Sequence, residues 1–233
     1  MGIGLLIMKQ IAFSLILSLL TSIYVSGQER VTVRPGEDLS EVLSSGRYLF
    51  SQFEDARIIL KNGTTHNAKM NYNALSGQME FIDLDGDTLV IRNQPKIVAF
   101  GPRLFKHVPS LGYAEILSTN NHQIELLVHR KFNAGGRKKM GAYGISSELS
   151  VVDSFQPNDI ERGRTGYSSG EEISYTKKNT FFIYADKKYR RANKATFIKI
   201  FGKDQLDQYL IEYPVDFNKQ EDILRFFAFC MLK

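Results

Sequence analysis

The stretch "GQMEFIDLDGDTLVIRN", residues 77–93, decides the fold class, because it joins two strand-like runs through a short turn. In "QMEFID" the apolar Met79 and Phe81 alternate with Glu80, a period of two that is typical of a half-buried strand. Asp85-Gly86 is a favoured pair for a two-residue hairpin loop, which needs positive φ. We therefore predict a β-hairpin here.

The three aspartates of this stretch, Asp83, Asp85 and Asp87, also resemble the start of a calcium-binding loop. An EF-hand loop that begins at Asp83 needs Gly at its sixth position and Glu at its twelfth. The sequence has Thr88 and Gln94 there. The aspartates are therefore interpreted as turn residues.

The same pattern extends over residues 47–130, where short strand-like runs alternate with turn signals. Runs such as "ARIILK", "KIVAFG" and "QIELLVHR" are rich in β-branched and aromatic residues, and "KNG", "LSG" and "NN" separate such runs. The gaps are too short for the helical crossovers that parallel strands need. The sequence predicts an antiparallel β-rich body, which could be a meander, a sandwich or a partly open barrel.

Residues 132–176 differ in composition, since glycine and serine are abundant and no period persists. We predict a long loop region with one or two short pieces of strand, such as "SELSVV". A loop of this length in a compact domain is usually functional or disordered.

The hydrophobic period changes after the strand "NTFFIYA", and about three short helices are predicted. The first surrounds residues 197–201 and ends at Gly202. The second follows Asp204 as its N-cap, and the third begins at Asn218 with Glu221 three positions later, as in a capping box. The fold class is therefore α+β. The expected domains are a β-rich domain over 28–189 and a C-terminal helical segment over 190–233 packed on it.

The first 27 residues predict a secretory signal peptide. After Lys9 comes the 15-residue apolar run "IAFSLILSLLTSIYV", followed by the small residues "VSG", so cleavage is expected after Gly27. An uncleaved anchor is the alternative, but 15 helical residues span only ~22 Å of a ~30 Å hydrocarbon core. Met1 and Met8 are both possible starts. The expected location is periplasmic or secreted, and Cys230, the one cysteine, predicts no internal disulfide.

Positive charge is concentrated in one segment. Between Lys177 and Lys203 there are nine Lys or Arg residues and one acid, Asp186. Aromatic residues are interleaved with these cations, which is how sugars and single-stranded nucleic acids are held, although the same aromatics also fit the periods that build a core. The candidate binding residues are Lys187, Lys188, Tyr189, Arg190 and Arg191.

An exported protein is not expected to bind nucleic acid, so the predicted partner is an anionic envelope component or a glycan. A merely solvated face is the alternative. Membrane contact is expected only through the signal segment before cleavage.

Catalytic motifs are incomplete. "GYSSG", residues 166–170, has the G-x-S-x-G spacing around Ser168, but it lacks the buried strand before it and the helix after it, and every histidine precedes it. No HExxH or CxxC occurs, and Ala142 stands where a phosphate-binding loop needs lysine. No catalytic residue, metal site or cofactor is predicted, and an enzyme is less expected than a binding protein.

"VTVRPGEDLSEVL", residues 31–43, resembles the opening of a LysM module, the small βααβ domain that binds N-acetylglucosamine polymers. A LysM closes with a strand within about thirty further residues, and that half is absent from the sequence. The alternative is a strand, a Pro-Gly turn and a helix with acids at its start.

The segments "LKNGTTHNAKMNYNALSGQMEFIDLDGDTLVI", "GAYG" at 141–144, "ANKATFIKIFG" and "VDFNKQEDILRFF" together resemble a family of uncharacterised exported proteins of Gram-negative bacteria. Signal peptides cleaved just before Gln are common in that family. The resemblance implies an envelope or extracellular location and a β-rich body with C-terminal helices, and it implies no activity. The expected function is a non-catalytic binding or structural accessory of the cell envelope. An envelope-acting hydrolase and a glycan- or peptidoglycan-binding module are the alternatives.

Overall fold

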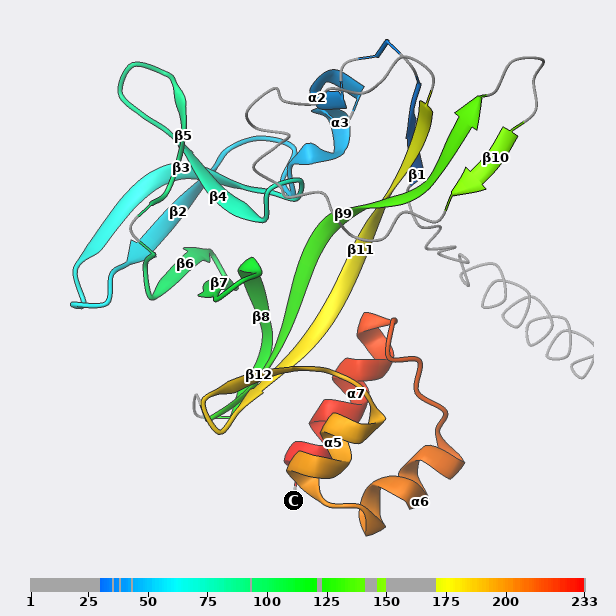
Figure 1. The fold of residues 1–233 in the computed structure, drawn as a ribbon. Helices are drawn as coiled ribbons and strands as arrows, with labels where there is room; N and C mark the ends of the chain where they lie inside the picture. Colours follow the sequence, from blue (N-terminus) through cyan, green and yellow to red (C-terminus); the bar gives the residue numbers. More distant parts are fainter. Residues whose placement is uncertain are drawn as a thin grey trace, which may run out of the picture.

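The computed structural model describes residues 30–34, 36–37, 39–42, 44–92, 94–120, 123–140, 146–149 and 171–232 (Figure 1). It confirms an α+β fold with an antiparallel β-rich body and three C-terminal helices. The strands are β1 (Arg30–Val33), β2 (Glu54–Ile59), β3 (Thr65–Asn73), β4 (Gln78–Ile82), β5 (Thr88–Val90), β6 (Ile97–Phe100), β7 (Arg103–Val108), β8 (Gly112–Asn120), β9 (Ile124–Met140), β10 (Ser146–Leu149), β11 (Glu171–Ala185) and β12 (Lys188–Arg191).

These strands form one open sheet with the order β1-β11-β9-β8-β7-β6-β2-β3-β4-β5. In addition, β10 pairs with β9, and β12 pairs with β11. Most neighbours are consecutive in the chain, which explains why local strand and turn signals were sufficient to predict the body.

The β4–β5 hairpin is confirmed, and its loop is longer than predicted. Ile82 pairs with Thr88, so five residues connect the strands rather than two. The Asp83 side chain accepts hydrogen bonds from the backbone N–H groups of Asp85 and Asp87, at 3.0 and 2.8 Å, and Gly86 has φ +89°. The aspartate therefore organises its own turn, in the way that Asx turns do.

The predicted loop over 132–176 is partly wrong. β9 continues to Met140, β10 covers 146–149 and β11 begins at Glu171. The two long strands pair from Glu171↔Lys139 to Tyr184↔Glu125, so each satisfies the other's backbone groups over most of its length. Gly135 and Gly136 weaken the local strand signal, and they lie at a register shift between the pairs Arg137↔Ile173 and Ala134↔Tyr175, on both sides of which the pairing with β11 continues.

The three helices of the C-terminal segment are α5 (Lys194–Phe201), α6 (Asp204–Glu212) and α7 (Gln220–Met231). They pack on one face of β9 and β11 (Figure 1). We call the buried residues of this contact the C-terminal core: Leu126, Val128, Phe181, Ile183, Ala185, Ala192, Phe197, Leu206, Ile223, Phe226, Phe227 and Cys230. No helix within the described ranges is long and apolar enough to cross a membrane.

Two of the predicted helix starts are corrected. Asp204 is the first residue of α6 rather than its N-cap, and α7 begins at Gln220 without a side-chain cap. In place of the expected capping box, the Asp222 carboxylate accepts a hydrogen bond from the backbone N–H of Asp216, at 3.0 Å. The end of α5 at Gly202 is confirmed.

The N-terminal strand β1 is the edge strand of the sheet beside β11, at the opposite edge from β5. β1 pairs with β11, with Val33 opposite Ile173, and the short helices α2 (Leu39–Val42) and α3 (Ser44–Arg47) follow. A LysM module would pair this strand with one from the next thirty residues, and here its partner lies about 140 positions away. The resemblance of residues 31–43 to LysM therefore does not extend to strand pairing.

Candidate functional site

The five candidate binding residues lie on one β-hairpin, formed by the end of β11 and by β12. Ala185 pairs with Lys188 and Phe182 with Arg191, and the turn between the strands consists of Asp186 and Lys187. Both turn residues are left-handed, with φ 52° and 59°. Aspartate tolerates this conformation, whereas for lysine it is strained by about 1 kcal/mol.

The structure separates the aromatic residues of the basic segment into two groups. Phe181 and Phe197 are buried in the C-terminal core, and Phe201 is partly buried against it. Tyr184 and Tyr189 lie on the opposite face of the sheet, with their ring centroids 4.7 Å apart. Both tyrosines are partly buried there against a smaller cluster of Val108, Ala114 and Leu127, so these aromatic residues pack on both faces of the sheet.

Tyr184 and Tyr189 enclose a lysine from a different part of the sheet. The Nζ atom of Lys106, on β7, lies 4.4 Å from the ring centroid of Tyr184 and 5.5 Å from that of Tyr189. Lys106 also donates a hydrogen bond to the Glu125 carboxylate at 2.5 Å. We call these four residues the lysine cage.

The electrostatics of the lysine cage favour the charged ion pair. Burial alone would lower the pKa of Lys106, but the hydrogen bond and negative charge of Glu125 outweigh it, so the pKa lies above its usual value. Burial raises the pKa of Tyr189, and the nearby Lys106 opposes part of that rise. The cage therefore fixes the base of the hairpin to β7 and β9.

The outer part of the hairpin remains available to solvent. Lys187 and Lys188, at the turn, are exposed, and so is Arg191 at the opposite end of β12. No carboxylate of a described residue lies within the 4.0 Å ion-pair distance of these three side chains. Arg190 is half-buried, and its guanidinium donates a hydrogen bond to the Ala185 carbonyl at 3.0 Å. The hairpin thus combines a fixed base with a cationic tip, which could attract an anion.

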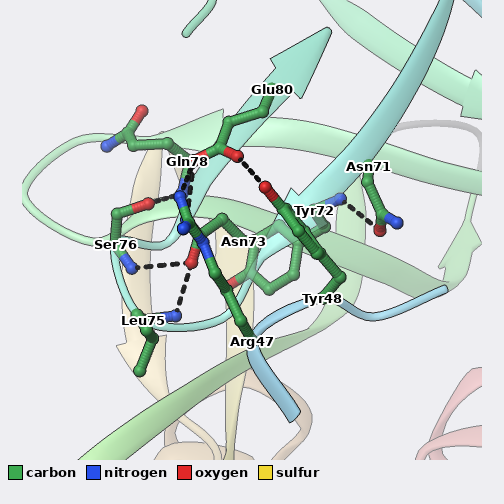
Figure 2. A network of polar contacts seen from close by, with 9 residues as sticks. All are labelled: Arg47, Tyr48, Asn71, Tyr72, Asn73, Leu75, Ser76, Gln78 and Glu80. Atoms are coloured by element: carbon green, nitrogen blue, oxygen red, sulfur yellow. Dashed lines mark hydrogen bonds and ion pairs between the residues drawn. The ribbon is translucent and has the colours of Figure 1, made fainter. Parts of the chain in front are cut away.

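A second polar cluster surrounds Glu80, which is buried with 2% of its surface exposed (Figure 2). Its carboxylate accepts hydrogen bonds from the Tyr48 hydroxyl at 2.7 Å, the Asn73 amide at 2.6 Å and the Arg47 guanidinium at 3.3 Å. Burial, followed by the hydrogen bond to Glu80, raises the pKa of Tyr48 to about 12. Three of the roughly four acceptor sites of this carboxylate are therefore occupied by groups of the protein, as in a structural group.

The asparagines beside Glu80 hold backbone rather than ligand. Asn73 accepts hydrogen bonds from the backbone N–H groups of Leu75 and Ser76, at 2.9 and 3.3 Å. Asn71 donates to the carbonyls of Phe50 and Gln52, both at 2.9 Å. Together with Glu80 they fasten residues 47–52 to the β3–β4 turn.

A third buried carboxylate, Glu115, is held by two arginines. Arg103 forms a bidentate pair with it at 2.6 and 2.9 Å, and Arg130 donates to it at 2.7 Å. Burial lowers the pKa of Arg130, and Glu115 opposes that change. Arg130 also donates to Gln220 at 3.3 Å, so the cluster links the sheet to the start of α7.

The histidines do not converge on a common site within the described residues. His66 is exposed, His107 stacks edge-on against Tyr113 with ring centroids 5.4 Å apart, and His122 lies outside the described residues. His129 is buried, and its Nε2 atom has no hydrogen-bond partner in the part of the chain that the structure describes. Burial, with a smaller effect of Lys131, lowers the pKa of His129 to about 4. The described ranges contain no group of three or more His, Cys, Asp or Glu residues placed to hold a metal ion.

A shallow concavity of about 430 Å³ lies over β2, β3 and β6. Its lining includes Asp55, Arg57 and Asn67, together with small residues at positions 56, 99 and 101. None of the predicted binding residues contributes to it. Its polar groups come from two adjacent strands and do not form a set of converging catalytic groups.

Ser168, the candidate for a hydrolase nucleophile, lies outside the described residues. Sequence reasoning missed Lys106 and Glu125, which make the base of the hairpin rigid. A weak signal existed for Glu125, an acid between apolar residues in "QIELL", but its partner is not visible locally. A scan against protein-family models, a search of curated proteins and a search of solved structures each find no match.

Proposed function

We propose that this protein is a non-catalytic binding or structural accessory of the bacterial cell envelope, exported by its N-terminal signal segment. The observation that carries the proposal is the β11–β12 hairpin. Its base is fixed by the lysine cage, while Lys187 and Lys188 remain exposed at its tip.

The buried carboxylates support a non-catalytic role. Glu80, Glu115 and Glu125 are at most 6% exposed, and each is paired with a lysine or an arginine. A general acid or base must be able to reach substrate and exchange protons with it. These three groups instead connect elements of the fold.

Export is tested by expressing the full chain in a Gram-negative host and fractionating the cells. The expected result is a soluble periplasmic or secreted product whose first residue is Gln28. A product that stays in the cytoplasm with Met1 or Met8 at its start would overturn the proposal.

The non-catalytic role is tested by incubating the purified mature protein with isolated peptidoglycan and envelope lipids. We expect no release of soluble fragments or free acyl chains. Turnover that disappears in a Ser168→Ala variant would replace this proposal with the hydrolase alternative.

A further inference from the structure

We propose that the tip of the β11–β12 hairpin docks on the phosphate groups of an anionic lipid surface. The inference rests on the proposed envelope function and identifies the partner of the same site. Three features of the hairpin carry it: its charge, its shape and its rigidity.

The charge of the tip is cationic and not neutralised locally. Lys187, in the turn, and Lys188, directly after it, are exposed, and no carboxylate of a described residue is in ion-pair range of them. Asp186, in the turn, is the one acid between Lys177 and Lys203. Each exposed cation near an anionic membrane surface strengthens partitioning about fivefold, so the two lysines give about 25-fold.

The shape of the tip favours a surface over a small ligand. The hairpin turns through two residues and β12 has only four, so it forms a convex end to the long β9–β11 pair (Figure 1). Small molecules and single sugar units are usually held in concave sites. The concavity over β2, β3 and β6 involves none of the hairpin residues. A planar layer of phosphates, by contrast, can approach a protruding tip from one side.

The rigidity of the base lowers the cost of docking. Tyr189 is held against Tyr184 and over Lys106, and Arg190 is tied to the Ala185 carbonyl. The backbone of the tip is therefore ordered before contact, and only the exposed side chains lose freedom on binding. This proposal revises the expectation that only the signal segment contacts a membrane.

The test is a vesicle co-sedimentation assay with the mature protein. Vesicles of phosphatidylcholine alone are compared with vesicles that contain about one third phosphatidylglycerol, at low salt and at about 0.5 M salt, where the Debye length is only about 4 Å. We expect binding to the anionic vesicles at low salt, loss of that binding at high salt, and no binding to phosphatidylcholine.

The site is tested with two matched double variants. The hairpin variant Lys187→Gln/Lys188→Gln is expected to bind anionic vesicles about 25-fold more weakly. The control variant Lys61→Gln/Lys96→Gln removes the same charge from exposed positions elsewhere and is expected to retain most of the binding. Equal losses in both variants would overturn the proposal, because net charge rather than the hairpin would then be responsible.

A single variant separates binding from folding. Lys187→Gly removes one cation and relieves the left-handed strain at φ 59°. Its affinity for anionic vesicles should fall about fivefold while its urea midpoint does not decrease. An affinity equal to that of the parent protein would contradict a role for Lys187.

Two further outcomes decide against the proposal. Absence of binding to anionic vesicles, or binding to a soluble polyanion such as polyphosphate but not to vesicles, would overturn it. Either result would leave the envelope proposal intact if the protein is still found in the periplasm. A cytoplasmic protein that binds vesicles would contradict the envelope proposal alone.

Discussion

The Nζ atom of Lys106 on β7 lies 5.5 Å from the ring centroid of Tyr189 on β12, although β8, β9 and β11 separate these strands in the sheet. Strands in a flat sheet are spaced ~4.8 Å apart, so this contact requires the sheet to curl strongly toward this face. The curl brings Tyr184 and Tyr189 over the buried ion pair of Lys106 and Glu125. It is the physical basis of the rigid hairpin.

Removing Lys106 should be costly. In a Lys106→Met variant the buried Glu125 carboxylate loses its cation, and we expect the free energy of unfolding to fall by about 3 kcal/mol. The double variant Lys106→Met/Glu125→Met replaces the pair by apolar groups and should recover to within about 1 kcal/mol of the parent. Urea denaturation of the parent, the single variants Lys106→Met and Glu125→Met, and the double variant completes a double-mutant cycle that measures this. A double variant as unstable as the single one would contradict the interpretation.

Gly112 should not tolerate a side chain. A Cβ atom there would clash with the Gly77 carbonyl oxygen, which also accepts a hydrogen bond from the backbone N–H of Tyr113 at 2.8 Å. We expect Gly112→Ala to destabilise the protein by about 3 kcal/mol or more. Gly63→Ala is the matched control, because Gly63 has φ +87° but open space around it, and should cost only about 1 kcal/mol. Similar thermal midpoints for the two variants would refute the close approach.

His129 should make the fold sensitive to acid. Its pKa is about 4 in the folded protein and about 6.5 in an unfolded chain, so the unfolded state binds its proton first. The resulting stabilisation is complete above about pH 6.5 and is lost as pH falls toward 4, by about 3 kcal/mol in total. Between pH 7 and pH 4, the free energy of unfolding of a His129→Leu variant should therefore fall by about 3 kcal/mol less than that of the parent, as measured by urea denaturation. Parallel pH profiles for the variant and the parent would show that His129 does not titrate on unfolding.

The Tyr48 hydroxyl should stabilise the Glu80 cluster at neutral pH. Tyr48→Phe removes a 2.7 Å hydrogen bond to the carboxylate, and we expect a loss of about 1–2 kcal/mol in the free energy of unfolding. Because the pKa of Tyr48 is raised to about 12, this contribution is present below pH 10 and is lost as pH rises toward 12. The difference in the free energy of unfolding between the parent and Tyr48→Phe, measured by urea denaturation, should therefore become smaller as the pH rises above 10. Tyr213→Phe, at an exposed position, is the control and should change stability little.

Local patterns in the sequence were sufficient for much of the body. The alternation of Met79, Glu80 and Phe81 correctly predicted β4, and Gly86 correctly marked the turn that follows. The same alternation would have turned Glu80 toward solvent, and the structure buries it. Two of its three partners, Tyr48 and Arg47, lie more than thirty positions earlier, so no local pattern could identify them.

The candidate site was predicted in part. The sequence located the cations of 187–191 but could not separate Phe181, a core residue, from Tyr184, which lies on the opposite face. Phe181 and Tyr184 occupy odd and even positions of β11, so their side chains point to opposite faces of the sheet. This difference becomes informative only once it is known that the helices cover one face of β11. Lys106 gave no signal, because its role depends on the curl of the sheet.

The amino-acid order alone determined the fold class, the strand and helix content of most segments and the concentration of positive charge between 177 and 203, because these depend on neighbours within a few residues. The tertiary structure alone decided that β9 and β11 pair along most of their length, that β1 joins their far end, and that Lys106, Glu125 and the two tyrosines meet. Those contacts form between residues far apart in the chain, and their geometry follows from sheet twist and core packing, which short-range periodicity does not encode.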